Sequence, residues 1–213
     1  MALKVYQLGI INYSHAYAFQ KEIFSKVLSG KIDHGLIICS HNPVITAGRS
    51  VCPANREISE SELRSKGIEF FRTERGGDLT YHGEGQITAY PIFNLKSLRK
   101  DIHLFLRYLE EVIISFLGDC QIKGERKSGF TGVWIDDKKI ASIGVAVKRW
   151  VTYHGVSINI KRNDLAGYTF FKPCGLEVKM TSLEDELGRN ISIGGIAPQL
   201  ANNFQRTLAG YYN

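Results

Sequence analysis

Residues 132–160, GVWIDDKKIASIGVAVKRWVTYHGVSINI, contain three strand-like runs joined by two short turns. Asp136-Asp137 separates the first run from the second, and Lys148-Arg149-Trp150 separates the second from the third. Such short turns reverse the chain, because parallel neighbours need a crossover of about a dozen residues or more. The stretch therefore predicts two consecutive hairpins and argues against a regular βαβ alternation.

The rest of the chain adds helices before and after this run of strands. Apolar residues at helical spacing predict helices over 14–29, with Ser14 as the N-cap, and over 98–117. Shorter patterns predict helices over 58–67 and 197–211, and strands over 35–40, 68–73 and after the glycines that end at residue 85. Residues 41–50 read as a strand end and a loop. We expect an α+β fold with a mixed or antiparallel sheet flanked by helices.

Composition limits the classes of protein that this chain can represent. Its 213 residues, 44% hydrophobic and 23% charged, suit one soluble domain over 1–213, since composition marks no linker. No apolar run approaches the roughly 20 residues of a membrane helix, and the start lacks an export signal. We therefore expect a cytoplasmic protein that does not enter the membrane. The net charge of +6 is dispersed, which favours an acidic macromolecular partner over nucleic acid.

A glycine-rich segment, RGGDLTYHGEG (75–85), is the first candidate site. Its spacing fits neither a dinucleotide fingerprint nor a phosphate loop. Exposed backbone N–H groups there could hold an acyl oxygen, although an ordinary hairpin would need the same glycines. His82 and His154 share the tripeptide Tyr-His-Gly, and each can be structural or an acid–base group. A third metal ligand is missing, so we expect no metal and no cofactor.

Four cysteines, at positions 39, 52, 120 and 174, form no CxxC pair, and we expect free thiols. Cys39 and Cys120 suit buried positions, whereas Cys174 lies between Pro173 and Gly175 at an expected bend. Cys52 is its rival on local context. A thiol reacts as its thiolate, so a nearby cation would activate it.

Two adjacent lysines begin the second strand of the hairpin region. Lys138 reads as a solvated side chain, as do Lys172 and Lys179. For Lys139 the residues alone leave two interpretations open: a solvated charge, or an amine held beside a thiol.

Three ordered motifs resemble a known family. They are RGGDLTYHGEGQITAYPI (75–92), KKIASIGVAVKRWVTYHGVSINI (138–160) and PCGLEVKMTSL (173–183), and HNPVITAGR (41–49) is a weaker fourth. Together they closely resemble the lipoyl(octanoyl) transferases of lipoate biosynthesis. Two positions depart from the usual pattern, since Glu84 stands where proline is common and Ser157 where alanine is common.

The resemblance implies an acyltransferase with the fold of the biotin and lipoate protein ligases. Such enzymes take octanoyl from acyl carrier protein and pass it to a lysine of a lipoyl domain, in a 2-oxoacid dehydrogenase complex or the glycine-cleavage H protein. By the resemblance, Cys174 carries the acyl group as a thioester and Lys139 pairs with it.

The resemblance also implies a set of residues that contact the acyl chain. These are Arg75, Gly76, Gly77, Asp78, Leu79, Thr80, Tyr81, His82, Ser142, Ile143, Gly144, Gly155, Val156 and Ser157. His154 is a supporting candidate. The base of the second transfer step remains open among Lys139, His82 and His154, with neutral Lys139 as the best candidate.

Three alternatives remain beside this interpretation. An ATP-dependent lipoate or biotin ligase would share the fold but need no cysteine nucleophile. A non-catalytic module that binds lipoyl domains would need neither Cys174 nor Lys139. A thioesterase would pass the acyl group to water.

Overall fold

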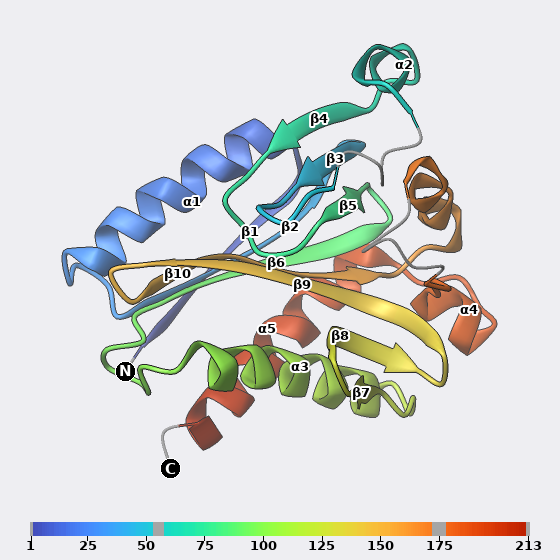
Figure 1. Cartoon of the computed structure of the whole chain (residues 1–213). Coiled ribbons are helices and arrows are strands. Elements are labelled where there is room, and N and C mark those ends of the chain that lie inside the picture. The colour runs from blue at the N-terminus through green and yellow to red at the C-terminus, as the bar shows by residue number, and fades with distance from the viewer. Residues whose placement is uncertain (1, 53–57, 172–177, 212–213) are drawn as a thin grey trace.

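The computed structural model describes residues 2–52, 58–171 and 178–211. Their strands form a seven-stranded sheet in the order β1-β2-β6-β10-β9-β8-β7 and a three-stranded sheet in the order β4-β3-β5 (Figure 1). The large sheet comprises β1 (Leu3–Ile11), β2 (His34–His41), β6 (Gln86–Phe93), β7 (Glu125–Lys127), β8 (Phe130–Ile135), β9 (Lys138–Lys148) and β10 (Val151–Asn159). The small sheet comprises β3 (Val44–Ala47), β4 (Glu69–Arg72) and β5 (Leu79–His82).

Both sheets are mixed, which confirms the expected fold class. β1 runs parallel to β2 and β3 runs parallel to β4, while the other pairs are antiparallel. The two predicted hairpins are present, and Asp136, Arg149 and Trp150 have the positive φ angles that tight hairpin turns require.

Helices cover the large sheet on both faces. The helices are α1 (Tyr13–Leu28), α2 (Glu60–Ser65), α3 (Ile102–Asp119), α4 (Leu183–Leu187) and α5 (Ile193–Tyr211), with a 3₁₀ segment η2 (Arg162–Phe170). α1 and the small sheet lie on one side of the large sheet, and α3 and α5 on the other (Figure 1). Strand β2 serves both cores, because Leu36 and Ile38 pack toward α3 while Ile37 and Cys39 pack toward α1.

The predicted helices are present with changed ends. Ser14 lies inside α1, and the N-cap position is Asn12, so the expected serine cap is wrong. α3 begins after Asp101, whose side chain accepts a hydrogen bond from the Leu104 N–H and so caps the helix. α2 ends as expected near Gly67, whose φ is +72°.

Six elements were not predicted from the sequence: β1, β3, β5, β7, η2 and α4; β3 and β5 lie in segments that we read as a loop and as a glycine-rich segment. β1 and β7 are the two edges of the large sheet. In the part of the chain that the structure describes, no helix is long and apolar enough to cross a membrane.

Candidate active site

A cavity of about 580 Å³ opens between the glycine-rich segment and strands β9 and β10. Its volume is within the range of small-molecule sites, about 300–1,000 Å³. The expected acyl-contacting residues that line it are Arg75, Gly76, Gly77, Asp78, Leu79, Thr80, His82, Ser142, Ile143, Gly144, Gly155, Val156 and Ser157, and Lys139 and His154 line it too. Motifs from three parts of the sequence thus meet at one place.

Tyr81 is the exception among the expected residues. Its ring packs in the core of the small sheet, where a side chain at Gly167 would collide with it. Thr80 and His82 line the cavity, whereas Tyr81, whose side chain lies between theirs on the opposite face of β5, does not. Tyr81 is therefore the one expected acyl-contacting residue that the structure places in the core of the small sheet and not at the cavity wall.

Arg75 fixes the glycine-rich segment to the small sheet. Its side chain is nearly buried, and its guanidinium donates to the Thr46 carbonyl oxygen at 2.6 Å, to the Asp78 carbonyl oxygen at 2.7 Å and to the Gly76 carbonyl oxygen at 3.0 Å. The planar, five-donor guanidinium suits such a set of carbonyl acceptors. Arg75 therefore has a structural use in addition to lining the cavity.

The glycines of this segment allow backbone to approach backbone. The Gly76 N–H donates to the Val145 carbonyl oxygen at 2.9 Å, which attaches the segment to β9. A Cβ atom on Gly144 would lie 2.8 Å from the Gly76 carbonyl oxygen, and one on Gly48 would lie 2.2 Å from the Gly77 carbonyl oxygen. Gly77 also has a φ of +87°, which favours glycine. These contacts explain why glycine stands at these positions.

Lys139 lies at the start of β9 and lines the cavity. Its backbone N–H donates to the Lys179 carbonyl oxygen at 2.8 Å, and its carbonyl oxygen accepts from the Thr181 N–H at 3.0 Å. Met180, between these two residues, forms a parallel β-bridge with Lys139 and also lines the cavity. The chain that follows the PCG motif is thus held directly against the strand that carries Lys139.

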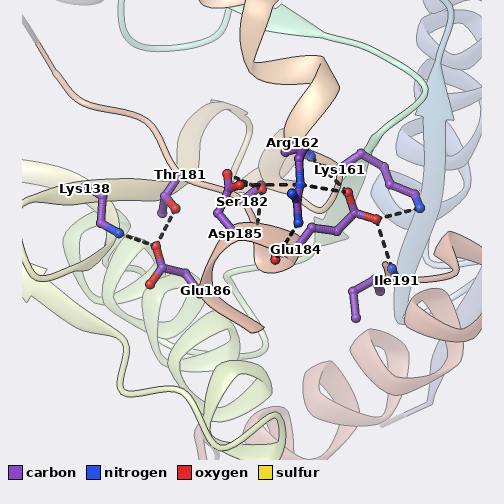
Figure 2. Close-up of polar contacts among 9 residues, drawn as sticks. All are labelled: Lys138, Lys161, Arg162, Thr181, Ser182, Glu184, Asp185, Glu186 and Ile191. Atoms are coloured by element: carbon purple, nitrogen blue, oxygen red, sulfur yellow. Dashed lines mark hydrogen bonds and ion pairs between the residues drawn. The ribbon is translucent and has the colours of Figure 1, made fainter. Parts of the chain in front are cut away.

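Lys138 is not the purely solvated residue that we expected. Its Nζ atom contacts the Glu186 Oε1 atom at 2.5 Å, and the Thr181 hydroxyl donates to the same oxygen at 2.5 Å (Figure 2). We call these three residues the Glu186 cluster. It joins β9, the segment before α4 and α4 itself. Lys179 is exposed, as predicted, and contacts only the exposed Asp137 among the ion pairs that the structure describes.

Glu184 attaches the same short helix to the end of β10. Its carboxylate accepts from Lys161 Nζ at 2.8 Å and from the Ile191 N–H at 3.0 Å, and it lies near Arg162 (Figure 2). Hydrogen bonds from Lys161 and from the Ile191 backbone hold the pKa of Glu184 at about 2. α4 is therefore fixed on both sides.

The candidate histidines are buried, and burial disfavours the charged form of both. Burial lowers the pKa of His82 well below its usual value, and burial together with the Arg75 charge lowers the pKa of His154 to about 4. The Nε2 atom of His154 lies 3.7 Å from the Glu74 carboxylate, and its ring stacks on Tyr17. His154 pairs with Val145, six residues along β9 from Lys139, or roughly 20 Å at the rise of a strand.

The cysteines differ in their surroundings. Cys39 is buried, and burial raises the pKa of its thiol; burial and the neighbouring Asp119 raise the pKa of Cys120. Both therefore favour the unreactive thiol form, while Cys52 is exposed. Cys174, like Lys172, Pro173 and Gly175, lies outside the described residues. Tyr168 and Met180, which lie on either side of it in the sequence, both line the cavity.

Other cavity residues were not singled out from the sequence. They are Tyr13, Thr88, Tyr90, Ile102, Leu106, Gly129, Phe130, Thr131, Val145, Tyr168 and Met180. Strand alternation could have indicated Thr88 and Tyr90, which lie on the face of β6 opposite Ile87 and Ala89. Across the described residues, no group of three or more histidine, cysteine or acidic side chains is arranged to hold a metal.

Comparison with known families gives an extensive match. Residues 12–205 match the model of the lipoyl protein ligase A/B catalytic domain. The chain is 40% identical over 212 residues to the octanoyltransferase of Thermoanaerobacter pseudethanolicus, which covers 99% of this chain and 92% of that protein. It is 41% identical over 211 residues to the octanoyltransferase of Rubrobacter xylanophilus, covering 97% and 94% of the two chains.

Solved structures of ligases share the fold. A crystal structure of lipoate-protein ligase A bound with ATP superposes with a TM-score of 0.77 at 15% identity, covering 98% of this chain and 86% of that one. A lipoate protein ligase from T. acidophilum with bound lipoic acid superposes with a TM-score of 0.75 at 16% identity, covering 98% of this chain and 87% of that one. The biotin protein ligase of Aquifex aeolicus superposes with a TM-score of 0.56 at 11% identity, covering 98% of this chain and 70% of that one.

Proposed function

The chain belongs to the lipoyl protein ligase A/B catalytic-domain family, and we propose that within it the chain is an octanoyltransferase that uses a cysteine thioester. The donor is octanoyl-acyl carrier protein. The acceptors are lipoyl domains of 2-oxoacid dehydrogenase complexes and the glycine-cleavage H protein. The observation that supports this most is the meeting of Lys139 with the expected acyl-contacting residues in one cavity.

In the first step Cys174 is the nucleophile. Its thiolate attacks the carbonyl carbon of the octanoyl thioester, the bond to the carrier's sulfur breaks, and the carrier leaves as a thiol after taking a proton. The Lys139 ammonium favours the thiolate before attack and is the donor of that proton. One thioester replaces another, so the step needs no ATP.

In the second step the acceptor lysine attacks the Cys174 thioester. A C–N bond forms, the C–S bond breaks, and the proton lost by the attacking amine passes to neutral Lys139. The position of Lys139 supports its role as the base, whereas the lowered pKa values of His82 and His154, and the distance of His154 from Lys139 along β9, speak against theirs. Amide formation makes this step strongly downhill.

The acyl chain would extend from Lys139 along β9 toward the glycine-rich segment. Apolar residues such as Ile143 and Val156 line that path. The oxyanion would need free backbone donors, and two in the segment are occupied: the Gly76 N–H by Val145 and the Gly85 N–H by Asp164. The net charge of +6 suits the acidic surfaces of carrier proteins and lipoyl domains.

The test is intact mass spectrometry after mixing the enzyme with octanoyl-acyl carrier protein, without ATP. We expect a mass increase of one octanoyl group that is lost on adding an apo-lipoyl domain, with the group recovered on that domain. Cys174→Ala should abolish the increase, and Cys52→Ala should leave it unchanged. Acylated Cys174→Ala protein, or a strict need for ATP and free octanoate, would reject the mechanism in favour of another nucleophile or a ligase.

A further inference from the structure

Trp134 in β8 stands directly opposite Lys139 in β9. The two residues are register partners in the antiparallel pair, and the Lys139 Nζ atom lies 4.9 Å from the centre of the indole ring. Register partners project from the same face of a sheet, and an ammonium within about 6 Å of an indole face is attracted by its quadrupole. Trp134 itself is almost buried, with 3% of its surface exposed. The ring is therefore a fixed, largely dry surface for this cation.

Gly132 provides the space through which the lysine side chain runs. A Cβ atom at this position would lie 2.7 Å from the Lys139 Cε atom and 2.6 Å from the Ala141 carbonyl oxygen. Gly132 also has a φ of +133°, which side chains rarely adopt. A glycine is thus required here for Lys139 to reach its position beside Trp134.

Glu110, in α3, fixes the part of β8 that contains Gly132. Its buried carboxylate accepts from the Gly132 N–H at 3.3 Å, from Arg107 at 2.6 Å and from Arg126 at 3.1 Å. A buried carboxylate is stable only when it is paired and hydrogen-bonded in this way. Helix α3 therefore fixes the strand that carries Gly132 and Trp134.

We propose that Trp134 is a positioning residue for Lys139: its ring face fixes the ammonium group at the cavity and favours the charged form of the lysine. The proposal deepens the proposed function and rests on it, because it gives Lys139 a catalytic role. In the first step the charged form is the one that favours the thiolate. The backbone contacts of Lys139 with Lys179 and Thr181 fix the main chain, and Trp134 fixes the end of the side chain.

Other charges near Lys139 act on it as well. Charged side chains on the neighbouring elements include Lys138, Lys179, Arg107, Arg126, Lys127, Asp136, Asp137, Glu110, Glu125, Glu184, Asp185 and Glu186. None of them is altered by a substitution of Trp134. A comparison of wild type with a Trp134 variant therefore isolates the contribution of the ring.

The experiment is an NMR titration of Lys139 in protein labelled with [ε-¹³C]lysine, with the resonance assigned by its loss in Lys139→Gln. Trp134→Leu should lower the pKa of Lys139 by about half a unit to one and a half units, the range that a cation–π contact implies. Trp134→Phe, which keeps a smaller ring face, should give an intermediate value and is the fallback if Trp134→Leu does not fold. The matched control is Trp150→Leu, at the exposed β9–β10 turn, which should cause no shift.

The kinetic readout separates positioning from carrier binding. Trp134→Leu should slow formation of the octanoyl-enzyme by about two- to thirtyfold while leaving the KM for octanoyl-acyl carrier protein unchanged. An unchanged pKa of Lys139 in both Trp134 variants would overturn the proposal. Acylation of Cys174→Ala protein would instead overturn the proposed function, and the titration would still report on the Trp134–Lys139 contact by itself.

Discussion

Removal of the Glu186 carboxylate should weaken the fold and the transfer reaction together. Glu186→Ala deletes the acceptor shared by Lys138 Nζ and the Thr181 hydroxyl, each at 2.5 Å (Figure 2). Thr181 belongs to the segment whose backbone pairs with Lys139. The substitution therefore loosens the contact between the chain that follows the PCG motif and the strand that carries the amine.

The structure gives the size of the expected effect. Lys138 is partly exposed, at 37% of its side chain, so its ion pair contributes about 1 kcal/mol at most. Thr181 is 2% exposed, and loss of a charge-assisted bond from a buried hydroxyl costs about 1–3 kcal/mol. The sum is roughly 1–4 kcal/mol, or a fall in Tm of roughly 2–16 °C for a domain of this size.

Urea unfolding followed by circular dichroism measures the loss of stability, and octanoyl-enzyme formation measures the loss of function. Glu186→Gln keeps an acceptor for Thr181 and should cost only about 1 kcal/mol. Glu111→Ala is the matched control, because it removes an exposed ion pair with Arg126 that lies outside the cluster. The reasoning fails if Glu186→Ala unfolds at the same urea concentration as wild type, or acylates at the wild-type rate.

Three further predictions concern the cavity, the buried histidines and the partners. Gly144→Ala should slow acylation at least severalfold and also lower the Tm, because its Cβ would lie 2.8 Å from the Gly76 carbonyl oxygen and would displace that backbone; stopped-flow acylation and thermal unfolding test this. Burial lowers the pKa of His41 to about 4, so the unfolded chain binds a proton at this residue more readily than the folded one. The free energy of unfolding should therefore be highest above pH 6.5 and should fall by roughly 2 kcal/mol at pH 5. Urea midpoints of His41→Gln should be less sensitive to pH over this window. The KM for octanoyl-acyl carrier protein should rise with salt between 50 mM and 500 mM if the +6 charge attracts the carrier. Steady-state kinetics measure this, and a KM that does not change with salt would contradict it.

The elements predicted correctly are those whose signal is local. The hairpins of residues 132–160 depend on short turns between apolar runs, and α3 depends on one apolar stripe. β1 gave no such signal, because none of its residues is fully buried and its partner, β2, lies more than twenty residues later. Edge strands and short elements such as β7 and α4 depend on tertiary contacts that no local pattern encodes.

In the candidate site, too, local motifs were predictable from the sequence, whereas contacts between distant segments were not. Motifs identified most of the cavity residues, but only the strand alternation seen in the structure separates Tyr81 from Thr80 and His82. The partner of Lys138 could not be inferred, since Glu186 is 48 residues away in the sequence. The contact of Lys139 with Trp134 depends on hairpin register, which a bulge between Val133 and Trp134 sets.

The two adjacent lysines illustrate why register matters to this site. Consecutive residues of a strand point to opposite faces, so Lys138 and Lys139 serve different purposes from one position on β9. Lys138 joins the Glu186 cluster that fixes α4, and Lys139 lies against Trp134 at the cavity. A slip of one residue in the β8–β9 pairing would exchange the two faces, placing the structural lysine at the cavity and the proposed catalytic lysine at α4. The positive φ of Asp136 in the connecting turn and the bulge beside Trp134 therefore determine which of the two lysines lies at the cavity.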